Sequence, residues 1–234
     1  MFAIYKRELA AYFNTPIGYI FCAVFLTLAG AAFSYTTLFS MSADVTSYFT
    51  YLLVMQVVLV PLLTMKLFSD ERKQRTEQLL LTAPVSLYGM VGGKFLAAYT
   101  LFAGCTLISF CSFFILYLYA DVKTAVLFGN LVAILLLGMT FIAIGLFVSS
   151  LTENQLAAAI GTVGILLLLM LISLLNSVIP VYWIRFVLSS ISVFARFQNF
   201  TQGVFDISAL FYYLSISVAF LFLTVRVFDK RRWG

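Results

Sequence analysis

The chain has 234 residues, of which 63% are hydrophobic and only 10% are charged, whereas soluble domains carry about 25% charged residues. This composition excludes an ordinary soluble protein and indicates one that is integral to a membrane. The formal net charge is +5, but the basic residues cluster beside apolar segments, so they indicate membrane orientation rather than nucleic-acid binding. The absence of histidine removes the commonest general base and the commonest metal ligand.

Residues 1–16 predict an amphipathic helix that lies on the inner membrane surface before the chain enters the bilayer, which we call the elbow helix. Arg7 and Glu8 are expected on its polar face, with Lys6 at the border and Ile4 as an exception to the pattern. The Asn-Thr-Pro sequence that ends at Pro16 breaks the helix before the first span. Within about 100° of the opposite face lie the apolar residues Phe2, Tyr5, Leu9, Tyr12 and Phe13.

Six apolar stretches are each long enough to cross about 30 Å of hydrocarbon as a helix. Each must be helical, because lipid offers no partner for an unpaired backbone group, and the runs are too long and too uniformly apolar for a β-barrel. We therefore expect an all-α membrane protein in which residues 1–234 form a single domain. Removal of the first stretch as a signal peptide, cut after Ala31, is disfavoured because the apolar run continues past that point. The predicted spans are residues 17–39, 48–68, 95–119, 124–150, 156–179 and 207–227.

The basic residues predict orientation. Of the fourteen Lys and Arg residues, eleven lie on the side of the two termini and three lie on the other side. Both termini and the 69–86 connection are therefore expected in the cytoplasm. A seventh span within 180–206 would place Arg185 or Arg196 in hydrocarbon, so we expect re-entrant or interfacial helices on the outer side instead. Aromatic residues suited to that depth are Tyr182, Trp183, Phe186, Phe194 and Phe197.

The polar residues offer little chemistry inside the spans. All nine acidic residues lie outside them, which disfavours a proton- or sodium-driven transporter. Gln56, Asn130 and Asn176 are expected to form hydrogen bonds between helices. A GMVGGKF motif departs from the phosphate-binding pattern in its glycine spacing and in the residue after lysine. Its glycines are therefore expected to allow close helix packing, and Lys94 to anchor the third span at the inner surface.

Small residues are expected to serve packing alone. Close contacts between helices are predicted at Gly138, Gly145, Gly161 and Gly164. The three cysteines, Cys22, Cys105 and Cys111, are expected to be small buried hydrophobes rather than disulfide partners or metal ligands. No residue of this chain is expected to bind a cofactor or a metal, or to carry out catalysis.

A charged insert, SDERKQRTEQLLLTAPVS at residues 69–86, separates the second and third apolar stretches. Ser69 or Asp70 is suited to cap a helix whose first turn is acidic, and this helix is expected to run through Leu81 and to end before Pro84. Ser86 is expected to cap the next helix. A polar start followed by three leucines suits a helix that sits in a cleft of a cytoplasmic partner, and a helix lying on lipid is the alternative.

This insert resembles the segment after the second span in permeases of the ABC-2 family, whose typical form is E-E-x-x-x-G-T-[IL]-E-L-L-L-[TS]-x-P-[VL]-S. The chain departs from that form at Arg75, where the family often has glycine, at Glu77, and at Gln78, which occupies the usual glutamate position. The sequences NTPIGYI and SSLTENQLAAAI, and the C-terminal segment, look like the short six-span gliding-motility-type (Gld) branch. The matching residues are Glu71, Thr76, Leu79, Leu80, Leu81, Thr82, Pro84, Ser86, Gly93 and Lys94.

The resemblance implies the permease subunit of an ATP-driven exporter in the bacterial inner membrane. Two permease copies, or one copy and a related permease, would form the pathway, often with an auxiliary Gld-type membrane protein. Two separate cytoplasmic ATPase subunits would bind ATP and Mg and grip the coupling helix between the second and third spans. The implied contact residues are Asp70, Glu71, Arg72, Thr76, Glu77, Leu79, Leu80, Leu81, Thr82 and Pro84.

Two further points stay open from the sequence. Glu153, with Asn154 and Gln155 in the turn between the fourth and fifth spans, is either a second contact for the ATPase or the capped start of a helix. A gradient-driven secondary transporter or channel, and a membrane scaffold that anchors a cytoplasmic complex, are the alternative functions.

Overall fold

A computed structural model describes residues 1–41, 45–76, 86–119, 124–178, 192–194, 196–201, 203 and 206–233. Within these ranges the secondary structure is helical, without a strand. The prediction of an all-α membrane protein with six spans is confirmed. The helices long and apolar enough to cross a membrane are Pro16–Phe39, Val45–Lys73, Leu87–Phe114, Thr124–Leu151, Gln155–Asn176 and Ile207–Arg232.

The first three spans are each built from two helical segments. The first joins α2 to a π-helical turn η1, the second joins α3 to α4, and the third joins α6 to the start of α7. The elements are α1 (Phe2–Asn14), α2 (Pro16–Phe33), η1 (Ser34–Phe39), α3 (Val45–Thr64), α4 (Lys66–Lys73), α6 (Leu87–Phe110), α7 (Ser112–Tyr119), α8 (Thr124–Leu151), α9 (Gln155–Val178), α11 (Phe197–Thr201) and α12 (Ile207–Trp233).

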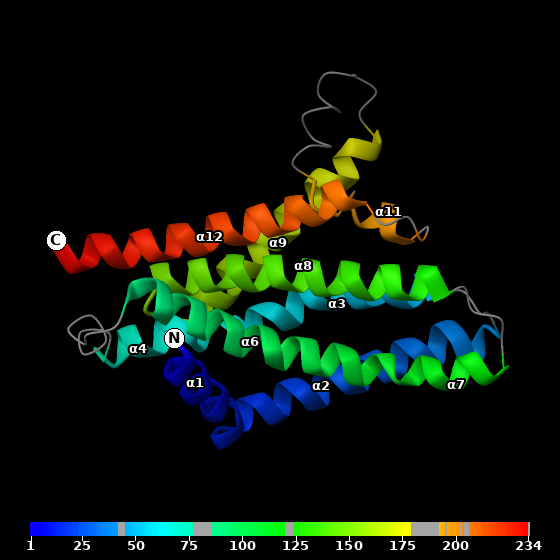
Figure 1. Cartoon of the computed structure of the whole chain (residues 1–234), viewed down its shortest axis with the longest axis horizontal. Coiled ribbons are helices and arrows are strands. Elements are labelled where there is room, and N and C mark those ends of the chain that lie inside the picture. Colours follow the sequence, from blue (N-terminus) through cyan, green and yellow to red (C-terminus); the bar gives the residue numbers. More distant parts are fainter. Residues whose placement is uncertain are drawn as a thin grey trace.

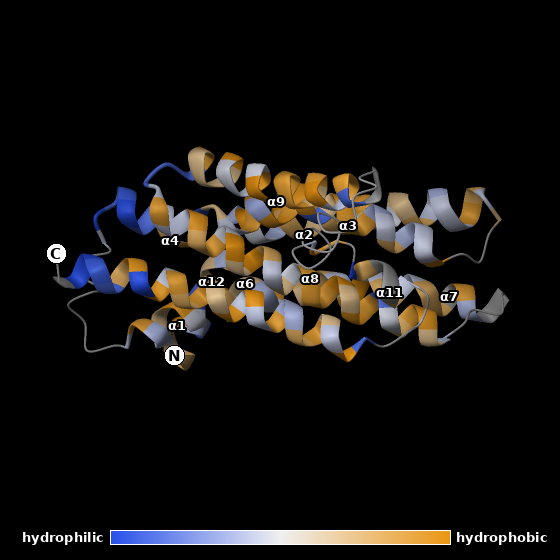
Figure 2. Cartoon of the chain, turned by 90° about the horizontal axis from the view of Figure 1, so that it is seen from above, coloured by the Kyte–Doolittle hydropathy of each residue, from blue (hydrophilic) through white to orange (hydrophobic). Residues whose placement is uncertain are grey.

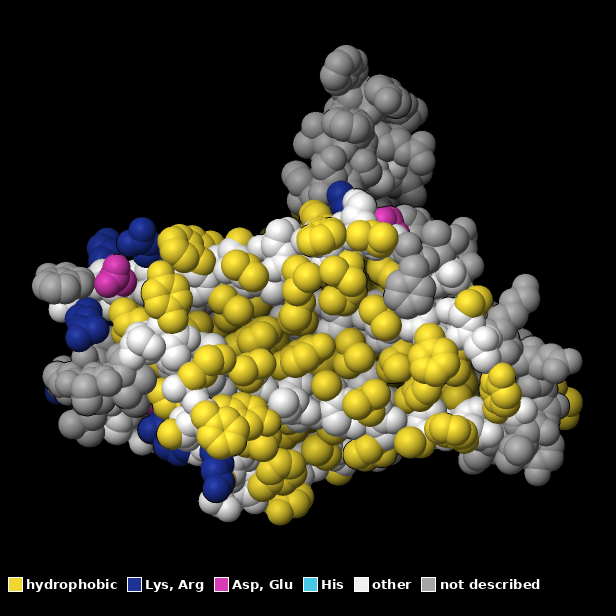
Figure 3. Space-filling view, in the orientation of Figure 1, with side chains coloured by type: hydrophobic (Ala, Val, Ile, Leu, Met, Phe, Trp, Pro, Cys, Tyr) yellow, Lys and Arg dark blue, Asp and Glu magenta, His cyan; other side chains and the backbone are white. Residues whose placement is uncertain are grey.

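The long helices share one main direction, and α1, α4 and both chain termini lie at the same end of the bundle (Figure 1). Hydrophilic residues concentrate at this end, whereas hydrophobic residues dominate the middle of the bundle (Figure 2). In the space-filling view, Lys and Arg side chains gather at the same end, and hydrophobic side chains cover the face beside it (Figure 3). This pattern is typical of a bundle whose apolar middle lies in lipid and whose charged end lies in water.

α8 is the central helix of the fold. It packs against α3, α6, α9 and α12, and its residues Ile134, Phe141 and Ile144 are fully buried. Apolar residues on the outer helices remain exposed, among them Val58 of α3 and Leu175 of α9. Because a membrane-spanning bundle meets hydrocarbon on its outside, these exposed side chains are suited to contact lipid rather than water.

Glycines allow the helices around α8 to approach closely, as predicted for three of four positions. A Cβ atom at Gly138 would overlap the ring of Phe102, so α6 and α8 could not pack this closely with a larger residue. Gly164 does not fit the prediction, because in the described part of the chain no other helix has an atom within 4 Å of the place where its Cβ would stand. The glycines that do meet a neighbouring helix are Gly138, Gly145 and Gly161.

The side-chain amides of Gln56, Asn130 and Asn176 do not form the predicted hydrogen bonds between helices. Gln56 is fully buried, and neither of its polar atoms has a hydrogen-bond partner. The side-chain oxygens of Asn130 and Asn176 also lack partners. Instead, Ser217 of α12 donates to the hydroxyl of Thr140 in α8 at 3.3 Å. Hydroxyl groups, which also bond to their own helix backbone, therefore take the role that was predicted for amides.

The cysteines agree with the prediction in part. Cys105 is buried and lies 3.3 Å from Cys22, Sγ to Sγ, with both thiols free. Cys111 is exposed on the outside of the bundle instead of buried. Within the described ranges no group of three potential metal ligands comes together.

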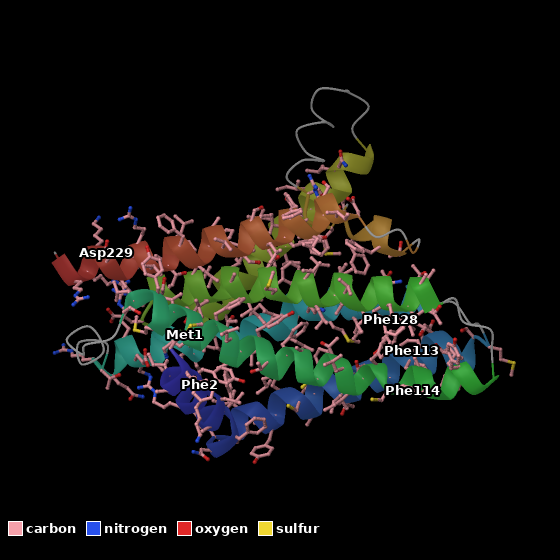
Figure 4. All side chains as sticks on the ribbon, in the orientation of Figure 1. Met1, Phe2, Phe113, Phe114, Phe128 and Asp229 are labelled. Carbon is pink, nitrogen blue, oxygen red and sulfur yellow. The ribbon has the colours of Figure 1, made fainter. Side chains whose placement is uncertain are left out.

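An aromatic cluster closes the end of the bundle that lies away from α4. Phe113 of α7 is buried there, with ring centroids 5.3 Å from Phe33, 4.9 Å from Tyr48 and 5.7 Å from Phe49. Figure 4 shows Phe113 at this end, far from Met1 at the other. Edge and stacked contacts of this kind add stability beyond the burial of apolar area.

The described part of the 180–206 segment packs onto the bundle. Phe194 and Phe197 are buried against the bundle, and the position of these two aromatic residues at the membrane interface stays a prediction. This part of the chain packs against α8, and the hydroxyl of Tyr213 in α12 donates a hydrogen bond to the carbonyl of Val193 at 2.7 Å. The guanidinium of Arg196 lies over the ring of Tyr212 at 4.1 Å, which gives the charge an aromatic partner.

Candidate functional site

α4 continues the second span at the charged end of the bundle, so it is not separate from that span (Figure 2). Ser149 of α8 joins it to the bundle, because its Oγ accepts hydrogen bonds from the N–H groups of Phe68 (3.1 Å) and Ser69 (3.2 Å). The same hydroxyl donates to the carbonyl of Met65 at 3.1 Å. Ser69 is therefore a buried residue inside a helix, and the predicted helix start at residues 69–70 is wrong.

α4 ends at Lys73, well before the predicted end at residue 81. Arg75 adopts a left-handed conformation with φ 56°, its N–H donates to the carbonyl of Arg72 at 3.1 Å, and the N–H of Thr76 donates to the carbonyl of Glu71 at 2.9 Å. These two bonds form the Schellman arrangement that ends many helices, usually with glycine at the left-handed position. The residue where the ABC-2 pattern often has glycine thus occupies a conformation that glycine adopts most readily.

Residues 77–85 lie outside the described residues, so part of the expected contact surface is not placed. Of the expected contact residues, Asp70, Glu71 and Arg72 lie on α4, and Thr76 lies in the turn that follows it. The expected contact residues outside the described ranges are Glu77, Leu79, Leu80, Leu81, Thr82 and Pro84.

The centre of the site is an ion cluster around Lys94 of α6, whose side chain is only 2% exposed. Its ammonium group donates to Glu71 at 2.8 Å and to the carbonyl of Leu67 at 2.8 Å, and it lies 3.2 Å from Glu8. Arg7 pairs with the same carboxylates, at 2.7 Å from Glu8 and 3.3 Å from Glu71. The hydrogen bond to Glu8 is the main cause that raises the pKa of Arg7, so its guanidinium stays charged.

This cluster corrects the prediction that Lys94 anchors the third span at the membrane surface. The helix of that span begins at Leu87, eight residues before the predicted start, and Ser86 caps it by accepting from the N–H of Gly89 at 3.2 Å. The predicted cap at Ser86 is thereby confirmed. Because the helix begins early, Lys94 lies two turns inside it, where two carboxylates and a carbonyl replace the water that a surface lysine would have.

The elbow helix turns its Glu8 side toward the bundle, which differs from the prediction of a polar outer face. Tyr12 is buried, and its hydroxyl donates to a carbonyl of α3 at 3.1 Å. Burial raises the pKa of Tyr12, so its hydroxyl remains a neutral donor. Ile4, the apparent exception in the pattern, packs where Gly93 of α6 has no side chain, with 3.1 Å between its Cγ2 and a Cβ built there. Phe2 remains exposed on the other side, as do Lys6 and Arg7.

α4 also holds the turn between α8 and α9. Arg72 lies 3.0 Å from the carboxylate of Glu153 and donates to the carbonyl of Leu151 at 2.7 Å. Asp70 accepts a hydrogen bond from the side-chain amide of Gln155, the first residue of α9. Adjacent side chains of α4 therefore join α6, the α8–α9 turn and α9 to one short helix.

The cap of α9 comes from Asn154, whose side-chain oxygen accepts from the N–H of Leu156 at 3.0 Å. Glu153 is 63% exposed and pairs with Arg72 instead, so its carboxylate is available at the surface while it is tied to α4. The start of α9 is therefore capped, as the alternative interpretation of this turn predicted, with Asn154 as the capping residue.

α12 completes the contacts of α4. The rings of Phe68 and Phe228 lie 4.6 Å apart, and the ammonium of Lys94 lies 5.2 Å from the Phe68 ring centroid. Nearby, Arg231 donates to the carbonyl of Ser150 at 2.7 Å. α4 is thus joined to α1, α6, α8, α9 and α12.

A comparison with known protein families matches the model of the ABC-2 family transporter protein to residues 13–233. The chain belongs to the ABC-2 family of transporter proteins. The matched range contains α4, α6 and the α8–α9 turn, so most of the site lies within the part of this ABC-2 transporter that matches the family, whereas Arg7 and Glu8 precede it. No curated protein matched the chain.

Sequence reasoning on this ABC-2 protein missed Ser149 and misplaced Glu8 and Lys94. A signal for Lys94 was present: a helix capped at Ser86 puts Gly93 and Lys94 well inside the third span, where a lysine needs partners. Ser149 gave no such signal, because a serine near the end of an apolar helix commonly bonds to its own backbone.

Proposed function

We propose that this ABC-2 protein is the permease subunit of an ATP-driven exporter, and that residues 69–86 receive force from a separate cytoplasmic ATPase. The observation that carries the proposal is the position of α4, which is joined to five helices by the contacts described above. A displacement applied to the chain directly after Lys73 would reach all five helices, because packed helices move as nearly rigid bodies.

Two neighbouring side chains of α4 would transmit the movement to different helices. Glu71 would transmit movement to α1 and α6 through the Lys94 cluster, and Arg72 would transmit it to the α8–α9 turn through Glu153. The leucines at 79–81 would occupy a cleft of the ATPase, which alone binds ATP and Mg²⁺. Glu153, exposed beside α4, would provide the second contact.

The proposed assembly is a pair of permeases, either two copies or one copy with a related chain, with two ATPase subunits. We place it in the bacterial inner membrane with both termini in the cytoplasm. In support, both termini lie at the α4 end of the bundle, where Lys and Arg gather (Figures 1 and 3). The resemblance to the Gld branch adds an auxiliary membrane protein to the expected partners.

The test is co-purification of the chain with the ATPase whose reading frame adjoins its own, using Leu80→Asp and the matched control Leu80→Ile. An aspartate buried in an apolar cleft loses about 2 kcal/mol or more, so Leu80→Asp should weaken ATPase binding at least about tenfold. Leu80→Ile should bind normally. If both variants bound the ATPase equally well, residues 69–86 would not form the ATPase contact.

A second arm separates force transmission from docking. Arg72→Gln keeps the leucines but removes the ion pair with Glu153. It should retain the bound ATPase while transport per ATP hydrolysed falls. Uphill transport by the purified chain alone, with an ion gradient and no nucleotide, would instead establish a secondary transporter.

A further inference from the structure

We infer that a groove between α1 and α4 binds the headgroup of an aminophospholipid from the inner leaflet, through both its phosphate and its ammonium group. This inference goes beyond the proposed function and does not depend on an ATPase. The groove has a volume of about 580 Å³. One wall carries Arg7 and Ala11 of α1 and Thr15, the residue after this helix. The other wall carries Lys66 and Asp70 of α4 and Gln74, the residue after that helix.

The walls are regular because residues four apart lie on one face of a helix. The two helices run in opposite directions: Tyr12 bonds to the carbonyl of Leu63, whereas Arg7 pairs with Glu71 at the other end. Lys66 therefore faces the C-terminal part of α1, near the start of the first span. Below the walls lie the buried Tyr12, Leu67 and Lys94, which form the floor of the groove.

One end of the groove lies where lipid headgroups are expected. Ile17, the second residue of α2, lines it, and the next outward residues, Tyr19 and Ile20, are exposed apolar side chains. In a membrane-spanning helix such side chains meet lipid, so this end of the groove is level with the boundary between hydrocarbon and water. The volume lies within the roughly 300–1,000 Å³ of small-molecule sites, so the groove is large enough for a headgroup.

The charges select the type of headgroup. The lining has a net charge of zero, because three basic and three acidic side chains face the groove: Arg7, Lys66, Lys94, Glu8, Asp70 and Glu71. Four of these neutralise one another in the Lys94 cluster. In the described part of the chain, Lys66 has no acidic partner within 4 Å, and Asp70 has no basic one, since its contact is the amide of Gln155.

One cation and one anion are thus left one turn apart on α4. A phosphate on Lys66 and an ammonium on Asp70 would satisfy both, which describes phosphatidylethanolamine. A purely anionic lipid would leave Asp70 unmatched and repelled. Phosphatidylcholine carries the same charges, but its quaternary ammonium has no N–H to donate to a carboxylate.

The experiment measures lipid binding to the purified full-length chain by native mass spectrometry. Phosphatidylethanolamine, phosphatidylcholine and phosphatidylglycerol with identical acyl chains are titrated separately. The wild type should bind phosphatidylethanolamine most tightly. Lys66→Gln should weaken that binding about fivefold, the effect of one basic residue near a membrane surface. The control Lys6→Gln removes an exposed lysine of the same elbow helix that does not line the groove, and it should have no effect.

If a thermal-unfolding control shows that Lys66→Gln does not fold, a second variant tests the same groove. Asp70→Asn removes the partner of the ammonium group and should shift the preference from phosphatidylethanolamine toward phosphatidylglycerol. Equal binding of the three lipids by the wild type, or an equal loss in Lys6→Gln, would overturn the inference. Competition by soluble glycerophosphoethanolamine at the lipid's own concentration would show a free phosphate ester to be the ligand. Displacement of the lipid by the ATPase would assign the groove to that partner instead.

Discussion

Replacement of Lys94 by methionine removes the cation that bridges the elbow helix and α4 while keeping a side chain of similar length. In the native cluster the ammonium group contacts Glu71 at 2.8 Å, Glu8 at 3.2 Å and the carbonyl of Leu67 at 2.8 Å. The two carboxylates are only 19% and 13% exposed, so water cannot fully replace the lost partner.

The expected loss follows from these contacts. Removing one partner of a buried ion pair costs about 3–5 kcal/mol, because the remaining charge stays buried. Arg7 still contacts both carboxylates, at 2.7 and 3.3 Å, which keeps the loss near the lower limit. We therefore expect Lys94→Met to lower the free energy of unfolding by about 3 kcal/mol, or roughly 6–12 °C in Tm for a chain of this size.

The assay is thermal unfolding of the purified protein in detergent, followed by intrinsic fluorescence. Lys6→Met is the matched control, since it makes the same substitution at an exposed lysine of the elbow helix and should change stability by less than about 0.5 kcal/mol. The double variant Lys94→Met/Glu71→Gln should regain part of the loss, because it also removes one of the stranded carboxylates. If Lys94→Met and Lys6→Met unfold at the same temperature, the buried cluster does not exist as described.

Three further predictions concern single contacts. Ser149→Ala leaves two N–H groups of α4 without an acceptor and should cost about 1–3 kcal/mol in thermal unfolding, against little change for the exposed Ser215→Ala. Gly138→Ala should cost about 1–3 kcal/mol by overpacking α6 against α8, whereas Gly30→Ala, with open space around its Cβ position, should not destabilise. Because burial raises the pKa of Tyr12, its stabilising contribution should be complete below its ordinary value of about 10 and fall by about 1.4 kcal/mol per pH unit above it. Tyr12→Phe should remove that slope from the pH dependence of unfolding, and an unchanged slope would contradict the buried position.

Much of the membrane topology could be predicted because it depends on local composition. Whether a stretch of twenty residues enters lipid is decided by its own side chains, so the six spans and the cap at Ser86 followed from residues close together in the chain. The end of α4 was predicted less well. A left-handed arginine at position 75 looks like an ordinary helical residue in the sequence, and only the pattern of the ABC-2 family marked the place with glycine.

The candidate site depended on which helices become neighbours. Glu8 and Lys94 are 86 residues apart, and neither one's surroundings can be read from its own segment. The sequence determined that this chain crosses a membrane six times and carries a charged insert between the second and third spans, because transfer into lipid is governed by each segment's own composition. Only the tertiary structure decided that Lys94, Glu8 and Glu71 share one buried cluster and that Ser149 holds α4, because partners for buried polar groups come from helices distant in sequence.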